Sequence, residues 1–312
     1  PETITAELTD VDCYEAPEVT TENTSFDIEQ SFEDELHGFL LTVDFAKAAP
    51  QLYCAPGNGG IAADAECVAI NAMDIDGVVD FAKKNAVDLV FVAPDDPLAA
   101  GMVDALEKEG IRAFGPRANA AIIESSKVFS KNLMKKYGIP TADYAVFSDP
   151  KEVVEYVETR GKFPVVIKAD GLALGKGVII AQNFDEAKDA VHTIMEDKVF
   201  GASGNNVVVE EFLTGPEVSV LAFTDGKTLR PMVSSKDHKR ALDGDKGLNT
   251  GGMGTISPNP YYTNEIADEC MKTIFLPTVK AMQTEGRPFK GCLYFGLMLT
   301  PNGPKVIEYN AR

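Results

Sequence analysis

Residues 165–178 have the sequence Val-Val-Ile-Lys-Ala-Asp-Gly-Leu-Ala-Leu-Gly-Lys-Gly-Val. The apolar start predicts a strand, which ends on Lys168 and enters a loop with three glycines and a second lysine, Lys176. Glycines let backbone N–H groups approach an anion closely, and lysines add positive charge, so the loop favours a polyphosphate ligand. It matches neither the Gly-x-x-x-x-Gly-Lys-Ser/Thr motif nor the Gly-x-Gly-x-x-Gly motif. On this stretch alone, a β-hairpin with turn glycines explains the pattern equally well.

Strand and helix patterns alternate on both sides of this loop. Residues 87–93 form an apolar run typical of a buried strand, residues 99–109 have helical spacing, and residues 111–114 form a second strand. This order predicts a βαβ unit of a parallel sheet, followed by one long helix over residues 118–137. We then expect helices at residues 150–160, 184–195 and 264–283, and strands at residues 165–168, 178–181 and 207–211.

The later part of the chain favours antiparallel strand pairs. Strands at residues 218–224 and 228–233 flank the turn Asp225-Gly226, and strands at residues 292–300 and 305–310 flank Pro301-Asn302-Gly303. A polar loop over residues 234–254 lies between the two pairs. The fold class is therefore α/β followed by α+β.

Composition narrows the class of protein. The net charge of −19 argues against nucleic acid as a partner, because phosphate neutralisation needs clustered Lys and Arg. Residues 1–47 hold 13 acidic residues and one lysine, so we expect this segment to be disordered. No apolar run reaches the roughly 18 residues of a membrane span, no leader pattern is present, and the five cysteines form no Cys-x-x-Cys pair. These features favour a cytoplasmic protein without a membrane partner.

Further positions carry polar groups that a nucleotide or metal site needs. Lys127 lies in the long helix, where a single lysine is usually just a solvated side chain. Glu210 and Glu211 end an apolar strand on opposite faces, so one can face a cleft, although acids that protect an edge strand are an equal alternative. Glu308 and Asn310 share one face of the last strand, and their oxygens suit Mg²⁺. On spacing alone, an exposed polar face explains that last pair slightly better.

The polar loop over residues 234–254 is cationic and rich in glycine. It contains Asp237-His238-Lys239-Arg240 and Asn249-Thr250-Gly251-Gly252-Met253-Gly254. Long loops inside a compact domain are often functional. A surface loop with a satisfied histidine is the competing interpretation.

These positions taken in order resemble the nucleotide site of the ATP-grasp superfamily: Lys127, Lys168, the loop at residues 171–177, Glu210, Glu211, Glu217, Glu308 and Asn310. Within it, the chain resembles the glycinamide ribonucleotide synthetase family, the phosphoribosylamine–glycine ligases, over about residues 52–312. This closer resemblance also rests on both polar-loop motifs and on Pro56-Gly57-Asn58-Gly59-Gly60, Ala93-Pro94-Asp95-Asp96-Pro97-Leu98 and Phe114-Gly115-Pro116.

The resemblance implies a reaction and a site. ATP would phosphorylate the carboxylate of glycine, and the amine of 5-phosphoribosylamine would then displace phosphate, giving glycinamide ribonucleotide for purine synthesis. The implied cofactors are ATP and Mg²⁺ or Mn²⁺. ATP would contact Lys127, Lys168, Gly171, Gly175, Lys176, Gly177, Glu210, Glu211 and Glu217, and the metal would contact Glu308 and Asn310. The implied catalytic residues are Asp237, His238, Lys239, Arg240 and Arg312, and the substrates would contact Asn249, Thr250, Gly251, Gly252, Met253, Gly254, Pro94 and Asp95.

The resemblance also implies four regions. Residues 1–47 would be an acidic segment outside the family, residues 48–120 a partial Rossmann-like domain, residues 121–195 the ATP-grasp lid subdomain, and residues 196–312 the ATP-grasp core. The family's opening Gly-rich turn has no counterpart before Leu52, and its C-terminal domain does not follow Arg312. A complementing chain that carries that domain is a candidate partner beside the small-molecule substrates.

Two other functions are compatible with these motifs. An inactive nucleotide-binding protein would keep the ATP cleft without turnover, and the missing Gly-rich turn favours it. An ATP-grasp ligase could also join a different carboxylate and amine, although the two polar-loop motifs favour glycine and 5-phosphoribosylamine.

Overall fold

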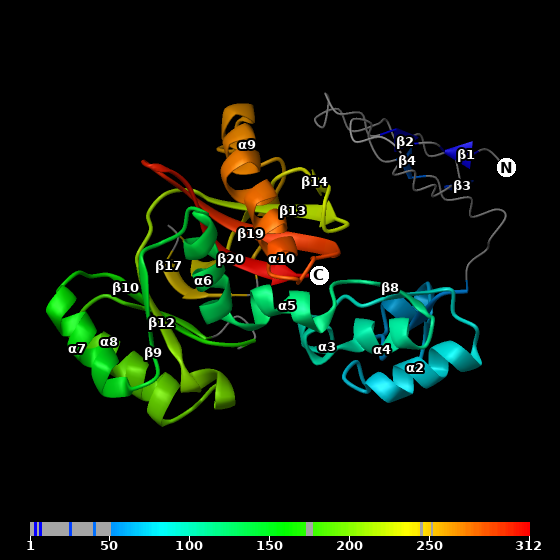
Figure 1. The fold of residues 1–312 in the computed structure, drawn as a ribbon, viewed down its shortest axis with the longest axis horizontal. Coiled ribbons are helices and arrows are strands. Elements are labelled where there is room, and N and C mark those ends of the chain that lie inside the picture. Colours follow the sequence, from blue (N-terminus) through cyan, green and yellow to red (C-terminus); the bar gives the residue numbers. More distant parts are fainter. Residues whose placement is uncertain are drawn as a thin grey trace. The chain divides into compact units, whose positions relative to one another are not determined.

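The computed structural model describes residues 51–172, 177–243, 246–250 and 252–312, together with four two-residue strands before residue 51 (Figure 1). Contacts divide the chain into two units, Pro1–Val78 and Val79–Arg312. Most of the expected acidic segment over residues 1–47 lies outside the described residues. No helix in the described ranges is long and apolar enough to cross a membrane. The four early strands are β1 (Thr3–Ile4), β2 (Ala6–Glu7), β3 (Ser25–Phe26) and β4 (Leu40–Leu41).

The first unit contains the Pro56-Gly57-Asn58-Gly59-Gly60 motif. It lies between β5 (Tyr53–Cys54) and β6 (Glu66–Cys67), which pair in parallel and are joined through η1 (Ile61–Ala63). Asn58 Oδ1 accepts hydrogen bonds from the N–H groups of Gly60 and Ile61, both at 3.0 Å. Gly57 has a φ of 76°, and a Cβ there would collide with Cys67 Sγ. Asn58 therefore stabilises this turn through its side chain, and Gly57 allows the backbone conformation that the turn needs. The helix α2 (Ile75–Lys84) follows β6.

The predicted βαβ unit is confirmed, with two differences. β7 (Leu89–Phe91) pairs in parallel with β8 (Arg112–Phe114). The expected helix is two helices, α3 (Asp95–Ala100) and α4 (Met102–Lys108), because Gly101 adopts a left-handed φ of 94°. The expectation of a buried strand is wrong, since Leu89 and Phe91 are 55% and 61% exposed. Side chains alternate along a strand, so Leu89 and Phe91 share one exposed face, whereas Val90 between them is partly buried.

The expected single helix over residues 118–137 is also two helices. α5 (Ala118–Ser125) and α6 (Lys127–Tyr137) meet at Ser126, whose φ and ψ are −135° and 111°. Ser126 Oγ caps α6 by accepting from Phe129 N at 3.0 Å. Asp170 Oδ1 accepts hydrogen bonds from Ser126 Oγ at 3.0 Å and Val128 N at 3.1 Å. A residue from the Gly-rich loop thus determines where α6 begins, which sequence periodicity did not reveal.

A small antiparallel sheet has the strand order β11-β10-β12-β9. Its strands are β9 (Tyr144–Phe147), β10 (Val165–Ala169), β11 (Val178–Ala181) and β12 (Val207–Glu211). α7 (Pro150–Arg160) and α8 (Phe184–Val191) lie side by side against it (Figure 1). The α8 pattern continues as a π-helical turn, His192–Glu196, and a 3-10 turn, Gly201–Asn205, precedes β12. The core of this layer includes Val153, Val157, Ile167, Ala187, Ile194 and Val209.

A larger antiparallel sheet has the order β14-β13-β19-β20. Its strands are β13 (Glu217–Thr224), β14 (Leu229–Pro231), β19 (Gly291–Thr300) and β20 (Gly303–Ala311). One face packs on α9 (Asn264–Cys270), a π-helical turn (Met271–Phe275) and α10 (Leu276–Thr284). Phe295 stands at the centre of this core, with ring centroids 4.3 Å from Phe275 and 5.6 Å from Tyr309. α6 contacts both α10 and β12, so it joins the two layers.

The polar segment over residues 234–254 is not the structureless loop that we expected. β15 (Lys236–Asp237) pairs with β18 (Thr255–Ile256), and β16 (Arg240–Leu242) pairs with β17 (Lys246–Asn249). These pairs satisfy backbone N–H and C=O groups that a loop would leave to water. The mixed α/β and α+β class is confirmed.

The central position of β19 leads to a stability prediction. Leu293 on β19 is fully buried, whereas Leu276 on α10 is 45% exposed. Leu293→Ala should lower the free energy of unfolding by about 2–5 kcal/mol, because a cavity forms in a close-packed core. The matched variant Leu276→Ala should cost less than about 1 kcal/mol. Urea titration measures both, and equal losses would contradict this description of the core.

Candidate active site

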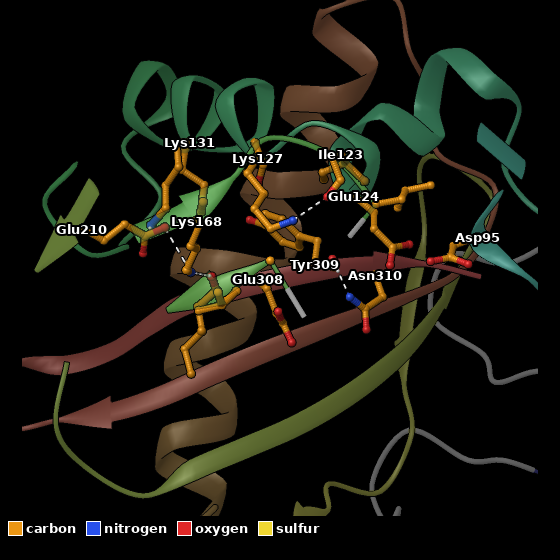
Figure 2. Close-up of a pocket in the computed structure, with 17 residues that line it drawn as sticks. Asp95, Ile123, Glu124, Lys127, Lys131, Lys168, Glu210, Glu308, Tyr309 and Asn310 are labelled. Atoms are coloured by element: carbon orange, nitrogen blue, oxygen red, sulfur yellow. Dashed lines mark hydrogen bonds and ion pairs between the residues drawn. The ribbon is translucent and has the colours of Figure 1, made fainter. Parts of the chain in front are cut away.

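A cleft within the second unit lies between the two sheets and is bordered by α5 and α6 (Figure 2). It gathers residues that are far apart in the chain. Those that were predicted from sequence and line this cleft are Asp95, Lys127, Lys168, Gly171, Gly177, Glu210, Glu308 and Asn310.

Three charged side chains are buried together at one side of the cleft (Figure 2). Lys131 Nζ lies 2.9 Å from one carboxylate oxygen of Glu210, and Lys168 Nζ lies 3.0 Å from the other. Their side chains are only 3%, 7% and 4% exposed for Lys131, Lys168 and Glu210. Burial lowers the pKa of Lys131 to about 8, although Glu210 partly offsets this effect. Two ammonium groups therefore share one carboxylate inside the protein.

Both lysines also reach the backbone of β20. Lys168 Nζ donates to Ile307 O at 3.2 Å. Lys131 Nζ donates to Thr141 Oγ1 at 2.7 Å, and Thr141 Oγ1 donates to Val306 O at 2.8 Å. The cluster thus connects α6 and the small sheet to the last strand of the large sheet.

Lys127 occupies the first turn of α6 and is partly buried. Its Nζ donates to Gly171 O at 2.7 Å. Burial, followed by the neighbouring charge of Lys168, lowers the pKa of Lys127. Gly171 has a φ of 144°, and a Cβ there would collide with Ser203. Lys127 and the beginning of the Gly-rich loop are therefore held together.

The end of β20 presents oxygen atoms to the cleft. Glu308 and Asn310 are partly exposed on the cleft side, whereas the intervening Tyr309 is 2% exposed and packs in the core (Figure 2). Among the described residues, none forms a hydrogen bond or ion pair with the Glu308 carboxylate. Asn310 Nδ2 donates to Tyr309 O at 2.8 Å. Asn310 Oδ1 accepts only a long hydrogen bond from Arg312 at 3.4 Å among the described residues, so it can also contact a cation. A carboxylate and an amide oxygen thus share one face, as predicted.

Glu124 holds the end of β20 in place. Its Oε2 accepts from Ala311 N at 2.6 Å and from an Arg312 guanidinium nitrogen at 3.3 Å. Burial nevertheless raises the pKa of Glu124 to about 7, because desolvation outweighs these two favourable contacts. Arg312 is therefore fixed at the rim of the cleft beside Asn310.

Three other predicted residues lie away from this centre. Glu211 faces the opposite side of β12, where Oε1 pairs with Lys305 at 2.9 Å and accepts from Asp143 N at 3.1 Å. Glu217 is about half exposed and lies 3.8 Å from Lys239 Nζ. Burial alone would lower the pKa of Lys239, but the neighbouring Tyr294 and the carboxylates of Glu308 and Glu217 outweigh burial and raise it. Lys239 and Glu217 thus contact each other outside the buried cluster.

The polar segment is held by its own backbone. His238 N donates to Gly254 O at 2.9 Å, and Met253 N donates to His238 O at 2.7 Å. Thr250 Oγ1 donates to Lys239 O at 2.8 Å. Gly252 has a φ of 118°, and a Cβ there would crowd Asp237 at 2.9 Å. These contacts bring the two polar-loop motifs together.

Some predicted residues cannot be placed. Gly175, Lys176 and Gly251 lie outside the described residues, and Arg240 and Asn249 are described only through their backbones. Pro94 precedes α3 and does not line the cleft, whereas its neighbour Asp95 does.

Two residues that line the cleft, Glu124 and Lys131, and two that hold it in place, Thr141 and Asp170, were not predicted from the sequence. One signal was available, because Lys131 is four residues after Lys127 and shares its helix face. No local pattern indicates that Lys131 is buried, since its partner Glu210 lies far along the chain.

Comparisons with known proteins agree with this geometry. The sequence pattern described as phosphoribosylglycinamide synthetase, ATP-grasp (A) domain, matches residues 125–312, and the N-domain pattern of the same family matches residues 37–124. The chain belongs to the phosphoribosylglycinamide synthetase family. The N-domain match of this family begins inside the acidic segment over residues 1–47.

Relatives in the phosphoribosylglycinamide synthetase family are closely similar. A phosphoribosylamine–glycine ligase from Listeria monocytogenes is 52% identical over 262 residues, covering 84% of this chain and 62% of that protein. The crystal structure of the Thermotoga maritima enzyme of the same name has a TM-score of 0.73 and 32% identity, covering 86% of this chain and 64% of the other. The chain thus spans under two thirds of these relatives' length.

The likeness in fold extends to proteins outside the family. One such structure is the biotin carboxylase–β-γ-ATP complex from Campylobacter jejuni. It has a TM-score of 0.69 at 16% identity, and the match covers 86% of this chain. At that identity the likeness concerns the fold alone. The ATP-grasp assignment itself comes from the family pattern that matches residues 125–312.

The buried carboxylate of Glu124 leads to a pH prediction. Its folded pKa of about 7 lies above the ordinary value of 4.5, so the folded state binds more protons than the unfolded state between these values. Stability should therefore fall as pH rises from 4.5 to 7, by on the order of 3 kcal/mol from this residue. Glu124→Gln should flatten that fall, measured by urea titration at several pH values.

The exposed α7 residue Glu155 provides a matched control. Glu155→Gln should keep the wild-type dependence of stability on pH. A Glu124→Gln profile identical to that of the wild type would show that burial does not control this carboxylate.

Proposed function

We propose that the cleft binds Mg·ATP and phosphorylates the carboxylate of glycine, which is then joined to 5-phosphoribosylamine. The observation that carries this proposal is the arrangement in Figure 2, where Lys127 and Lys168 line the same cleft as Glu308 and Asn310. Cationic groups and oxygen ligands in one cleft suit a metal-bound polyphosphate. Membership of the phosphoribosylglycinamide synthetase family supports the choice of substrates.

The nucleotide would lie between the two sheets. Lys127 and Lys168 would contact its phosphates, and the loop over residues 171–177 would cover them. Both carboxylate oxygens of Glu210 already pair with lysines. We therefore expect the backbone of β12 at Glu210, and not its side chain, to contact adenine. Glu211 and Glu217 are also expected near the nucleotide, although Glu211 would have to leave Lys305 to contact it.

The residues at the end of β20 fit a divalent cation. Glu308 has no competing hydrogen bond among the described residues, and Asn310 offers Oδ1. Mg²⁺ and Mn²⁺ prefer such oxygen ligands and commonly take only one or two from protein beside phosphates and water. No group of three or more His, Cys, Asp and Glu side chains in the described ranges forms a fuller metal site. When bound, the cation would neutralise charge on the transferred phosphoryl group.

The chemistry needs no covalent intermediate on the protein. A glycine carboxylate oxygen attacks the γ-phosphorus of ATP, the bond to the β-phosphate oxygen breaks, and ADP leaves. The amine nitrogen of 5-phosphoribosylamine then attacks the acyl carbon, the bond from that carbon to the phosphate oxygen breaks, and the nitrogen loses a proton. Lysine charges stabilise the transfer, and a covered cleft protects the acyl phosphate from water.

The substrates are proposed to lie at the rim, near the polar segment and Arg312. Asp237, His238, Lys239, Arg240 and Arg312 would orient the reacting groups, with residues 249–254, Pro94 and Asp95 around the substrates. The cytoplasm is the proposed location.

A turnover assay tests this function. Phosphate release from Mg·ATP is measured with glycine, with and without 5-phosphoribosylamine, beside ATP binding by calorimetry. The proposal predicts release that needs glycine and product that needs both substrates. ATP binding without glycine-dependent release would identify the inactive nucleotide-binding alternative. Release that needs another carboxylate would identify a ligase of different specificity.

Replacement of Lys168 tests the nucleotide site separately. Lys168→Met should weaken ATP binding by about 10- to 100-fold, the cost of one charge-assisted contact to phosphate. The Lys131–Glu210 pair remains in this variant, so no buried carboxylate is stranded. Lys162→Met, which changes an exposed lysine just before β10, should bind ATP normally. Unchanged affinity in Lys168→Met would contradict the site.

A further inference from the structure

Lys131 is a buried cation to which the proposed chemistry assigns no role. It is 2% exposed and lies on α6, one turn after Lys127. Its ammonium group already has two partners, Glu210 at 2.9 Å and Thr141 at 2.7 Å. The observed partners of Lys131 are therefore protein groups.

The position of Glu210 explains why a second lysine matters. With Lys131 removed, the carboxylate would be buried with Lys168 as its one ion-pair partner among the described residues. Both oxygens would then attract the Lys168 ammonium group, since an unpaired buried oxygen is costly. Lys168 would be drawn toward Glu210 and away from the phosphate side of the cleft.

We propose that Lys131 is a positioning residue for nucleotide binding, which holds one oxygen of Glu210 so that the other oxygen keeps Lys168 directed at the nucleotide phosphates. This inference rests on the nucleotide-binding part of the proposed function and not on the identity of the carboxylate or amine.

The net charge of the cluster supports this role. With all three groups ionised, two ammonium groups and one carboxylate leave one positive charge inside the protein, and Lys127 adds another nearby. Burial makes this excess positive charge unfavourable unless an anion binds in the cleft. A lysine that served only to neutralise Glu210 would be redundant, because Lys168 at 3.0 Å already provides that charge.

The test compares two ligands that differ only in phosphate. ATP and adenosine affinities are measured by calorimetry for the wild type and for Lys131→Met. We expect ATP binding to weaken by about tenfold or more, with adenosine binding within about twofold of the wild type. Lys131→Arg, which keeps the charge and the pair with Glu210, should restore most of the ATP affinity.

Two controls separate positioning from a general effect on folding. Lys135→Met changes an exposed lysine of the same helix whose Nζ is also near the Tyr144 ring, at 5.8 Å against 5.7 Å for Lys131. It should leave both affinities unchanged. In a Glu210→Gln background no carboxylate can capture Lys168, so adding Lys131→Met should weaken ATP binding by less than about threefold. This double variant has a neutral amide in place of the buried carboxylate, and it is measured if Lys131→Met alone does not fold.

Several results would overturn the proposal. They are unchanged ATP affinity in Lys131→Met, equal losses for ATP and adenosine, or a full tenfold loss in the Glu210→Gln background. A wild-type protein that binds ATP but releases no phosphate with glycine would refute the proposed reaction. The comparison of ATP and adenosine affinities would still test the role of Lys131.

Discussion

The carboxylate of Glu210 stands between the ammonium groups of Lys131 and Lys168, and the arrangement of the cleft depends on these two contacts. Glu210 comes from the small sheet, Lys131 comes from α6, and both lysines reach the backbone of β20 directly or through Thr141. A buried ion pair contributes little net stability, because desolvation offsets the attraction. The cluster instead orients the two lysines, whose hydrogen bonds to Ile307 O and to Thr141 join the small sheet and α6 to β20.

A second constraint acts at the N-terminal end of α6, one turn before Lys131. Asp170 in the Gly-rich loop accepts hydrogen bonds from Ser126 and Val128, and Lys127 donates to Gly171 in the same loop. The first turn of the helix and the beginning of the loop are therefore positioned by each other. This coupling places the Lys127 ammonium group beside the cleft although its own pKa is lowered by burial.

Local patterns predicted much of the fold. The periodicity and end residues of α7, β11 and β12 placed these elements at their observed bounds. The break at Ser126 was not predicted, because it depends on Asp170, which is 44 residues away in the chain. The alternation along β20 correctly placed Glu308 and Asn310 together. Lys131 was missed because only tertiary packing makes that lysine buried, and a lysine on an amphipathic helix normally faces water.

A crystal structure with Mg²⁺ and a non-hydrolysable ATP analogue tests the central claim most directly, namely that the buried cluster holds Lys168 for a nucleotide between the sheets. We expect phosphate oxygens within about 3.2 Å of both Lys127 Nζ and Lys168 Nζ, the cation on Glu308 and Asn310, and Lys131 still paired with Glu210. A triphosphate bound elsewhere, with Lys168 still held only by Glu210 and Ile307, would contradict it.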